Sequence, residues 1–364
     1  MPIQRFVTER ADLRRARWED VEALPLADGE ARLRIDSFAL TANNITYAAF
    51  GEAMSYWAFF PTGDAGTGLM PVWGFATVAE SRCAGLDAGE RIYGYWPIAS
   101  EVTLRPVKLT PAGFVDGTEH RRVLPPVYNR YRRCAADPGY DAAHEAEQAL
   151  LQPLFSTGFL IDDFLDENDF FGARQVLLSS ASSKTAYGTA FCLARRGDRI
   201  RRIGLTSTGN LDFTRSLGCY DEVIDYAAIP SLDASAAAVY VDFSGSAAVR
   251  AAVHGRFGDR LVHSCSVGAA DWSGLGSNKG LPGPKPTLFF APARIEKRVA
   301  DWGGAELNAR IGAAWAAFVQ RVSDPARPWM QVARGRGPEA IAAAYSALAE
   351  GRSNPREGHM LSLA

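Results

Sequence analysis

The chain has 364 residues, of which 47% are hydrophobic and 22% charged, and a formal net charge of −2. This length predicts two domains rather than one simple core. The near-neutral charge excludes a general attraction to nucleic acid or to an anionic membrane. No apolar run approaches the roughly 20 residues of a spanning helix, and the charged N-terminus lacks an apolar signal core. We therefore expect a cytoplasmic protein.

The cysteines and histidines do not form a recognisable metal or disulfide pattern. The five cysteines are widely spaced, with no CxxC pair, and the five histidines show no HxxxH spacing. A disulfide framework and a structural zinc site are therefore not expected, and no metal is predicted.

The first section of the chain has the alternating pattern of half-buried strands. Strands are predicted over 31–40, 72–81, 90–98 and 101–109. Several short strands at this spacing indicate a barrel or a sandwich. We assign residues 1–140 to this β-rich domain.

The second section alternates helices and strands. A helical pattern follows residue 141, and strands are predicted over 174–180, 200–206, 222–226, 237–243 and 260–266, with helices between them. Helices between strands require parallel crossovers, so the pattern predicts a doubly wound parallel sheet. Its domain spans 141–295.

The last section contains a short predicted strand over 287–292 and two alanine-rich helices over 305–322 and 338–349. A glycine- and proline-rich loop over 277–286 precedes it. We expect residues 296–364 to complete the first domain, with a ligand in the cleft between the two domains.

Two segments carry a family resemblance. VLLSSASSKTAYGTAFCLARRG, followed by NLDFTRSLGCYDEVIDY, resembles the medium-chain dehydrogenase/reductase superfamily, and in particular a divergent bacterial subgroup of its zinc-free quinone and enoyl reductase branch. SFALTANNITYAAFG and GLDAGERIYGYWPIASEVTL extend the resemblance into the first section. The resemblance implies an α/β fold with a GroES-like catalytic domain and a Rossmann domain, an NADPH cofactor and a homodimer.

The sequence departs from the superfamily in the residues that bind zinc. The cysteine and the G-H-E motif of the zinc alcohol dehydrogenases do not occur, and the strand where that motif would lie reads PVWGFATV. A substrate oxygen would then be polarised by hydrogen bonds instead of by a Lewis acid.

The loop after the first Rossmann strand is the predicted phosphate turn. In register with the family, its three glycine positions fall on Ala181, Ser183 and Ala186. A helix N-terminus has free N–H groups and a positive dipole end, so an anion cradle is predicted there. Its residues are Ser182, Ser183, Lys184 and Thr185. The alternative is a degenerate turn in which Lys184 is merely solvated. In a phosphate turn, the Ser183 side chain would occupy part of the space through which the pyrophosphate approaches the backbone.

The choice of cofactor rests on the second Rossmann strand. No acid lies between Asp198 and Asp212, whereas NAD-dependent enzymes usually place a carboxylate there. The neutral donors Thr206, Ser207, Thr208 and Asn210, together with Tyr226, favour the 2′-phosphate of NADPH. The alternative is a neutral loop with no bearing on the cofactor.

The resemblance also places residues beside the nicotinamide. On the Rossmann side they are Thr157, Phe243, Cys265, Phe289 and Phe290. On the catalytic side they are Asn43, Tyr47, Tyr56 and Trp57, with Thr46 where the family has an acid. A tyrosine hydroxyl there can donate a proton or a hydrogen bond, so Tyr47, Tyr56 and Asn43 are the predicted catalytic residues. The alternative is that these aromatic residues form core or a pocket wall.

The segment RRVLPPVYNRYRRC, residues 121–134, is rich in arginine. Bidentate arginines could clamp a carboxylate, a phosphate or a coenzyme A group, and the alternative is a solvated surface loop. With Trp57, we assign Tyr128 and Arg130 to the substrate site.

These patterns together predict an NADPH-dependent, zinc-independent reductase. It would transfer hydride to an enone, a quinone or an enoyl thioester, and its partner is a small molecule. Two alternatives stay open: a carbonyl or alcohol oxidoreductase of the same fold, and a nucleotide-binding sensor without turnover.

Overall fold

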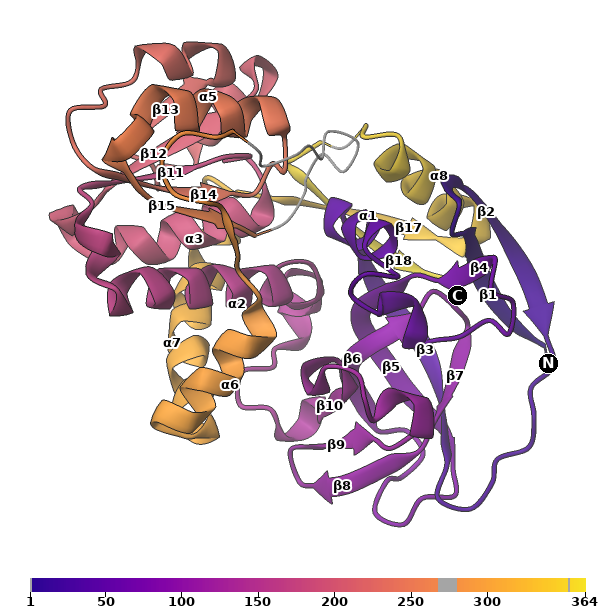
Figure 1. The fold of residues 1–364 in the computed structure, drawn as a ribbon. Coiled ribbons are helices and arrows are strands. Elements are labelled where there is room, and N and C mark those ends of the chain that lie inside the picture. Colours follow the sequence, from indigo (N-terminus) through magenta and orange to yellow (C-terminus); the bar gives the residue numbers. More distant parts are fainter. Residues whose placement is uncertain (1, 268–279, 353) are drawn as a thin grey trace. The chain divides into compact units, whose positions relative to one another are not determined.

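The computed structural model describes residues 2–267, 280–352 and 354–364 (Figure 1). The chain divides into two compact units: Met1–Leu150 with Gln331–Ala364, and Leu151–Met330. The sequence places the domain limits at 140/141 and 295/296, and those limits stay a prediction. Residues 277–279 of the predicted loop 277–286 lie outside the described residues.

Unit 1 is rich in strands. Its strands are β1 (Ile3–Glu9), β2 (Asp12–Val21), β3 (Ala31–Leu40), β4 (Thr67–Leu69), β5 (Pro71–Ser81), β6 (Arg91–Pro97), β7 (Glu101–Leu104), β8 (Pro106–Thr110), β9 (Gly113–Asp116), β10 (Arg130–Arg133), β17 (Gln331–Arg336) and β18 (Glu357–Ser362). Its helices are α1 (Ala42–Ala49) and α8 (Gly337–Ala349). They form a three-stranded sheet, β2-β1-β4, and a nine-stranded sheet that contains β17-β18-β3-β5-β6-β10-β9-β8 with β7 paired to β3.

Alternation along the strands explains the core of unit 1. In β3, Ala31, Leu33 and Ile35 are buried, whereas the intervening arginines reach toward solvent. Successive side chains of a strand point to opposite faces, so this alternation gives the sheet one apolar face that packs into the core.

Two parts of unit 1 differ from the sequence prediction. The hairpin of β1 and β2 was not predicted, because β2 is mostly charged and only Leu13 among its residues is fully buried. The strand predicted over 101–109 is two strands instead, β7 and β8. The break falls before Pro106, which has no N–H to give to a ladder, and the two strands pair with different partners, β3 and β9.

Unit 2 alternates strands and helices. Its strands are β11 (Gln175–Leu178), β12 (Arg201–Thr206), β13 (Glu222–Asp225), β14 (Ala238–Asp242), β15 (Leu261–Ser266) and β16 (Thr287–Leu288). Its helices are α2 (Glu145–Glu167, which begins in unit 1), α3 (Lys184–Ala194), α4 (Leu211–Ser216), α5 (Ala247–Phe257), α6 (Ala291–Trp302) and α7 (Gly304–Val322). The strands are all parallel in the order β13-β12-β11-β14-β15-β16.

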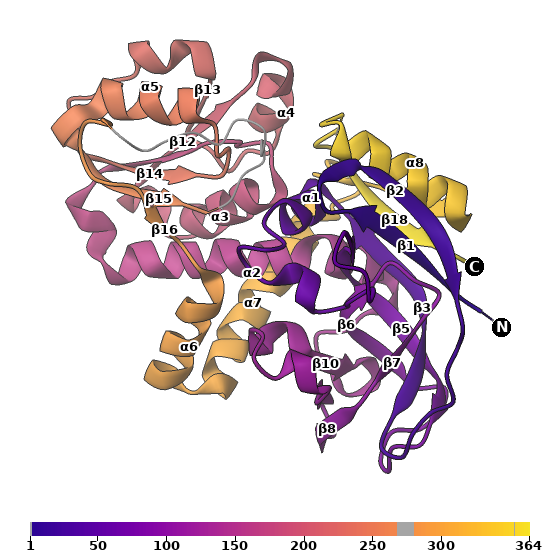
Figure 2. The same ribbon diagram turned by 45° about the vertical axis from the view of Figure 1, so that its right-hand side comes forward.

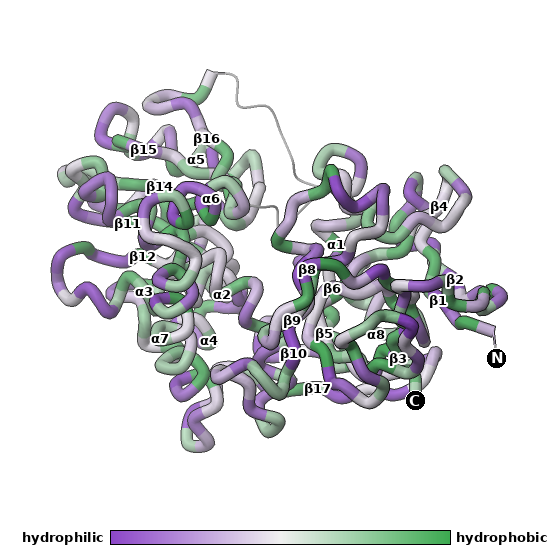
Figure 3. The backbone as a smooth tube through the Cα atoms, turned by 90° about the horizontal axis from the view of Figure 1, so that it is seen from below, coloured by the Kyte–Doolittle hydropathy of each residue, from purple (hydrophilic) through white to green (hydrophobic). Residues whose placement is uncertain are grey.

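This order is that of a Rossmann sheet, 3-2-1-4-5-6 in chain order. The central strands β11 and β14 are apolar along most of their length, as Figure 3 shows, because both of their faces are covered. Val176 and Leu178 face the core under α2 and α3, and Leu177 faces the core under α5. Figure 2 shows α5 and α3 on opposite faces of the sheet. The predicted α/β class, with a β-rich GroES-like unit and a doubly wound sheet, is confirmed.

Helices α2 and α3 pack closely through glycine. A Cβ added at Gly158 would lie 2.7 Å from the backbone nitrogen of Thr189, and one at Gly188 would touch Phe155 at 3.6 Å. Such a short distance to backbone leaves no room for a larger residue at 158, so the two helices can approach each other only because it is glycine.

The strand predicted over 287–292 is wrong beyond its first two residues. Strand β16 covers only Thr287–Leu288, and α6 begins at Ala291 with Pro292 in its first turn. Proline is favoured there because the first N–H groups of a helix have no intrahelical partner. Helix α6 itself was not predicted.

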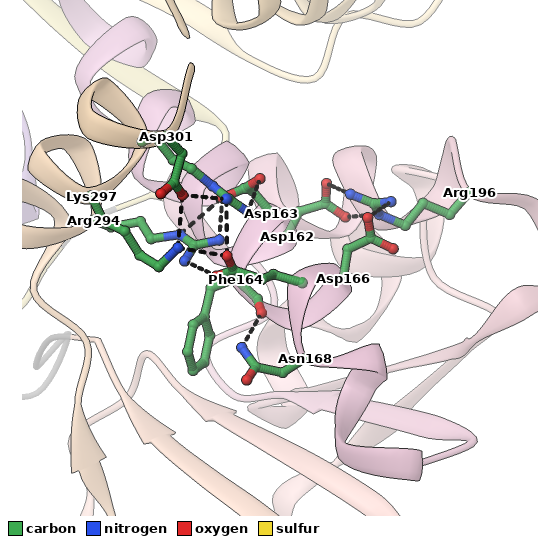
Figure 4. Close-up of polar contacts among 11 residues, drawn as sticks. Asp162, Asp163, Phe164, Asp166, Asn168, Arg196, Arg294, Lys297 and Asp301 are labelled. Carbon is green, nitrogen blue, oxygen red and sulfur yellow. Dashed lines mark hydrogen bonds and ion pairs between the residues drawn. The ribbon is translucent and has the colours of Figure 1, made fainter. Parts of the chain in front are cut away.

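Charged side chains fasten α6 to α2, as Figure 4 shows. The buried Asp163 of α2 accepts hydrogen bonds from Arg294 and Arg298 of α6, at 2.9 and 2.7 Å from their Nε atoms. On the other side of α2, Asp162 pairs with Arg196 at 2.7 Å. None of the helices in the described part of the chain is long and apolar enough to cross a membrane.

Candidate functional site

The carboxyl edge of the parallel sheet in unit 2 is the first candidate site. The strand order reverses between β11 and β14, and ligands of such sheets bind at the carboxyl ends beside this switch point. The turns after both strands meet here. The predicted cofactor residues fall mostly at this edge.

The turn after β11 contains a left-handed residue. Ser180 has φ of +46°, its backbone N–H donates to the Tyr226 hydroxyl at 2.9 Å, and the Tyr220 hydroxyl donates to the carbonyl of Ala181 at 2.8 Å. The position that calls for glycine is thus Ser180, one residue before the predicted Ala181. Tyrosine side chains from beyond β12 hold the turn.

The N-terminus of α3 follows directly. Ser183 is the N-cap, and its Oγ accepts a hydrogen bond from the N–H of Ala186 at 3.4 Å. Its side chain therefore bends back onto the helix. Lys184 and Thr185 occupy the first two helical positions, whose N–H groups have no intrahelical acceptor. Ser182 is buried beside them. These residues fit a phosphate group.

The switch point holds a buried ion pair that sequence reasoning missed. Asp242 ends β14, is 1% exposed and accepts from the Arg250 Nε at 3.0 Å. Its other oxygen accepts from Ser179 Oγ at 2.9 Å, and Ser179 Oγ accepts in turn from the N–H groups of Phe243 and Ser244 at 3.0 and 3.1 Å. The pair neutralises a carboxylate beside the predicted phosphate turn and connects the two turns. An aspartate at a strand end with an arginine eight residues later was the available signal.

Where the adenosine end of the cofactor is predicted, the structure has an acid that the sequence did not place there. Thr206 ends β12 and is buried, whereas Ser207 is exposed and Asn210 half-buried. Asp225, opposite Thr206 in β13, accepts a hydrogen bond from Thr208. Hydrogen bonds from Thr208 and from the N–H of Ala227 lower the pKa of Asp225, so it is anionic at neutral pH.

The residues predicted beside the nicotinamide differ in exposure. Phe243 and Cys265 are buried, and burial raises the pKa of the Cys265 thiol to about 12, so it is not a thiolate. Phe289 packs against the core near Phe164, and Phe290 is 38% exposed. Thr157 Oγ1 donates to the carbonyl of Pro153 within α2 at 3.2 Å. Their contact with a nicotinamide stays a prediction.

In unit 1 the predicted catalytic tyrosines lie in one aromatic cluster. The Tyr47 and Tyr56 rings are 4.5 Å apart, and the Tyr56 and Tyr128 hydroxyls share a hydrogen bond of 3.1 Å. Burial raises the pKa of Tyr47, and the neighbouring Tyr56 adds to this rise, whereas the nearby side chains of Trp73 and Asn43 oppose it. These phenols are therefore neutral donors.

Two of the predicted substrate residues have different surroundings. Trp57 is buried and packs against Gly51 and Gly68, where an added Cβ would lie 2.0 and 2.3 Å from the indole. Arg130 is exposed. Their contact with substrate stays a prediction.

At Arg121, the arginine-rich segment is neither a clamp for a ligand nor a solvated surface loop. This residue is 1% exposed, and it binds Asp116, Asn129 and the Tyr131 hydroxyl at 2.9, 2.9 and 2.8 Å. It therefore supports the fold of the loop that carries Tyr128, whose carbonyl also accepts from Arg121 at 2.9 Å.

A cavity of about 580 Å³ lies along α2 beside the charged residues of Figure 4. Asp162, Asp163 and Glu167 line it together with Arg196 and Arg298, and these side chains form ion pairs with one another or with their neighbours. The pairing gives them a structural role. Among residues 2–267, 280–352 and 354–364, no group of three or more His, Cys, Asp or Glu has the arrangement of a metal site.

Known structures share this fold. CurA from Vibrio vulnificus, solved in complex with NADPH, is 13% identical, with a TM-score of 0.61 over 99% of each chain. A quinone oxidoreductase from Coxiella burnetii is 10% identical, with a TM-score of 0.57 over all of both chains. The enoyl reductase JamJ, in its apo form, is 13% identical, with a TM-score of 0.60 over all of both chains. The fold is thus that of medium-chain quinone and enoyl reductases.

Comparison of sequences identifies one family and no curated relative. No curated protein matches the chain. One family model, described as "Protein of unknown function (DUF2855)", matches residues 38–354, which spans both units. The chain therefore belongs to the DUF2855 family.

Proposed function

We propose that this protein is an NADPH-dependent oxidoreductase that transfers hydride to an activated double bond or carbonyl, as in an enone, a quinone or an enoyl thioester. One observation carries the proposal. The turn of Ser180–Ser183 leads into the capped N-terminus of α3 beside the switch point of a 3-2-1-4-5-6 sheet. The likeness in fold to CurA, whose structure contains NADPH, supports it.

The residues of unit 2 have separate tasks in binding. The N–H groups of Lys184 and Thr185 and the Lys184 ammonium bind the pyrophosphate, with Ser182 and Ser183 lining the turn. Thr206, Ser207, Asn210 and Tyr226 face the adenosine ribose and its 2′-phosphate. Thr157, Phe243, Cys265, Phe289 and Phe290 line the nicotinamide. NADPH, when bound, supplies the hydride.

The residues of unit 1 act on the substrate. Tyr47 and Tyr56 are neutral phenols that donate to the substrate oxygen as negative charge develops there, and Asn43 orients Tyr47. The substrate gains the hydride and then one proton, which comes from a tyrosine or from water. Through the Tyr56–Tyr128 hydrogen bond, Tyr128 can return a proton to Tyr56 after Tyr56 has donated its own. Trp57, Tyr128 and Arg130 contact the substrate.

The proposal includes three further points. The reaction proceeds without zinc, because the sequence lacks the cysteine and the G-H-E motif of the zinc enzymes. The protein is a homodimer, as the family resemblance implies. It works in the cytoplasm on a small molecule.

Equilibrium titration tests the cofactor first. The intrinsic fluorescence of the protein is followed as NADPH or NADH is added, and we expect saturable binding with NADPH the tighter ligand. Absence of binding by either nucleotide contradicts the proposal. Consumption of NADPH is then measured with an enone, a quinone, an enoyl thioester and an aldehyde. Binding without consumption favours the sensor, and consumption with the aldehyde alone favours a carbonyl reductase.

A further inference from the structure

The aromatic cluster of unit 1 contains more than the predicted catalytic residues. We define it as Tyr47, Tyr56, Tyr95, Tyr128 and Trp73. Tyr95 lies at its centre: its ring centroid is 4.8 Å from that of Tyr128, 5.0 Å from that of Trp73 and 5.9 Å from that of Tyr47. Tyr95 comes from β6 and Trp73 from the neighbouring strand β5, where they face each other directly in the register.

Two polar atoms of this cluster are buried without a partner. The Tyr95 hydroxyl, on a fully buried side chain, has no hydrogen-bond partner among the described residues, and neither has the Trp73 indole nitrogen. The indole N–H lies near the Tyr47 hydroxyl, which it influences electrostatically, but no acceptor stands in hydrogen-bonding geometry. An unpaired buried donor costs stability, so its retention calls for an explanation.

Neighbouring aromatic residues on β6 and on the adjacent strand β10 do satisfy their donors. The Trp96 indole donates to the carbonyl of Gly74 at 2.9 Å, the Tyr131 hydroxyl donates to the carbonyl of Tyr95 at 2.9 Å, and the Tyr93 hydroxyl donates to the carbonyl of Gln148 at 3.5 Å. On β5 and β6, the described aromatic donors without a partner are therefore those of Trp73 and Tyr95, whereas Tyr187, Tyr240 and Trp329 of unit 2 also lack one. An indole nitrogen can only donate, so the missing partner of Trp73 is an acceptor.

The cluster is also the right chemical environment for a flat ligand. Burial raises the pKa of Tyr95 and of Tyr128 well above the ordinary value, and the mutual influence of the tyrosines adds to the rise. The hydroxyls therefore remain protonated donors at all physiological pH values. Trp73 and Tyr128 are only half-buried, so the cluster reaches the surface of its unit through them.

We propose that the Tyr95 hydroxyl and the Trp73 indole N–H bind one carbonyl oxygen of a planar, conjugated cyclic dicarbonyl substrate, whose other oxygen accepts hydrogen bonds from Tyr47 and Tyr56 and whose ring stacks against the tyrosine rings. This inference rests on the proposed reductase function and specifies its substrate class. Tyr95 and Trp73 are then specificity-determining residues in addition to Tyr47 and Tyr56. Stacking on aromatic faces favours a ring over a flexible acyl chain, and the two donors favour a ligand whose oxygen is an acceptor.

The test uses Tyr95→Phe, which removes only the hydroxyl, and menadione as the planar carbonyl probe. We expect kcat/KM for menadione to fall by about fivefold or more, mainly through KM, because one hydrogen bond to the substrate is lost. The NADPH dissociation constant stays unchanged. The thermal midpoint stays equal or rises, because a hydroxyl that has no partner in the free protein has been removed.

A matched control lies on the same strand. Tyr93→Phe removes a hydroxyl that already has a partner, so it lowers the thermal midpoint and leaves kcat/KM for menadione unchanged. Trp73→Phe provides a second variant, which removes the indole N–H and also raises KM. Both Tyr95→Phe and Trp73→Phe lower kcat/KM less for an acyclic enoyl thioester than for menadione.

Direct binding separates this inference from the proposed function. Quenching of intrinsic fluorescence by menadione is measured for the wild type and for Tyr95→Phe without any turnover. If NADPH binds but menadione does not bind the wild type, the substrate inference is wrong while the cofactor proposal stands. Equal menadione affinity in both proteins, or a lower thermal midpoint in Tyr95→Phe with unchanged kcat/KM, means that the hydroxyl holds a water molecule and overturns the inference.

Discussion

Ser180 has a left-handed backbone in a turn where glycine would adopt that conformation without steric cost. The hydrogen bond from its N–H to the Tyr226 hydroxyl helps to hold it there. Sequence register located the turn correctly but assigned the first glycine position to Ala181, one residue late. A one-residue error arises because small residues run together here, and only the backbone angles distinguish them.

Lys184 is the residue of the predicted phosphate turn whose charge we expect to contribute most to cofactor binding. In Lys184→Ala we expect the affinity for NADPH to fall about tenfold, because a charge-assisted hydrogen bond to a phosphate is lost. Fluorescence titration measures it. Lys285→Ala removes an exposed lysine of the same unit and serves as the control. Equal affinity in Lys184→Ala and the wild type would mean that Lys184 does not contact the cofactor.

Asp225 places a negative charge where the 2′-phosphate of NADPH is predicted. Hydrogen bonds lower its pKa, so the charge is present at neutral pH and opposes the phosphate. We expect Asp225→Asn to bind NADPH more tightly and to leave NADH unchanged or weaker. The ratio of the two dissociation constants measures this. An unchanged ratio would place the adenosine ribose away from Asp225.

At the scale of elements, the contact of α2 with α3 depends on a single missing side chain. In Gly158→Ala the new Cβ would lie 2.7 Å from the Thr189 backbone nitrogen, so the helices must separate. We expect a loss of about 1–3 kcal/mol in the free energy of unfolding, measured by urea denaturation.

Gly255 provides the matched control within α5. An added Cβ there meets nothing within 4 Å, so Gly255→Ala should stabilise the protein by about 0.5–1 kcal/mol through helix propensity. The two variants make the same chemical change with opposite expected signs. A stabilising Gly158→Ala would contradict the packing that we describe.

Helix α6 was missed because its anchoring is ionic and distant. Hydrophobic periodicity is the main signal for a helix, whereas Arg294 and Arg298 of α6 are buried against Asp163 of α2, more than 130 residues earlier in the chain. The same holds for the pair of Asp242 with Arg250, which a strand pattern does not indicate.

At the scale of the whole chain, ion pairs connect segments far apart and make stability depend on pH. Hydrogen bonds from Lys297 and Arg294 lower the pKa of Glu167 from 4.5 to about 2. A lowered pKa in the folded state means that this stabilisation is complete above about pH 4.5 and is lost as the pH falls toward 2.

Comparison of the wild type with Glu167→Gln tests this dependence. We expect the wild type to be the more stable at pH 6 and the difference between the two urea midpoints to shrink below pH 4.5. Added salt should also reduce the difference, because Glu167 is largely exposed to solvent. A difference that stays constant between pH 6 and pH 3 would mean that Glu167 stabilises the fold by some other means than its charge.

The sequence alone determined the class of fold and the place of the turn after the first strand of the parallel sheet. Apolar strands alternating with helices allow only a parallel sheet, since parallel strands need a crossover, and the resemblance in VLLSSASSKTAYGTAFCLA and LGCYDEVIDY located the turn. These are local patterns, and local patterns can be read along the chain.

Only the tertiary structure decided which polar groups meet. It paired Asp242 with Arg250, brought Asp225 to Thr208, buried Arg121 inside its loop and gave the Tyr95 hydroxyl no partner among the residues that the structure describes. Burial and the approach of distant strands set these contacts, and neither quantity is a property of neighbouring residues in the sequence. The physical reason is that a hydrogen bond depends on atoms within about 3 Å in space, whatever their separation along the chain.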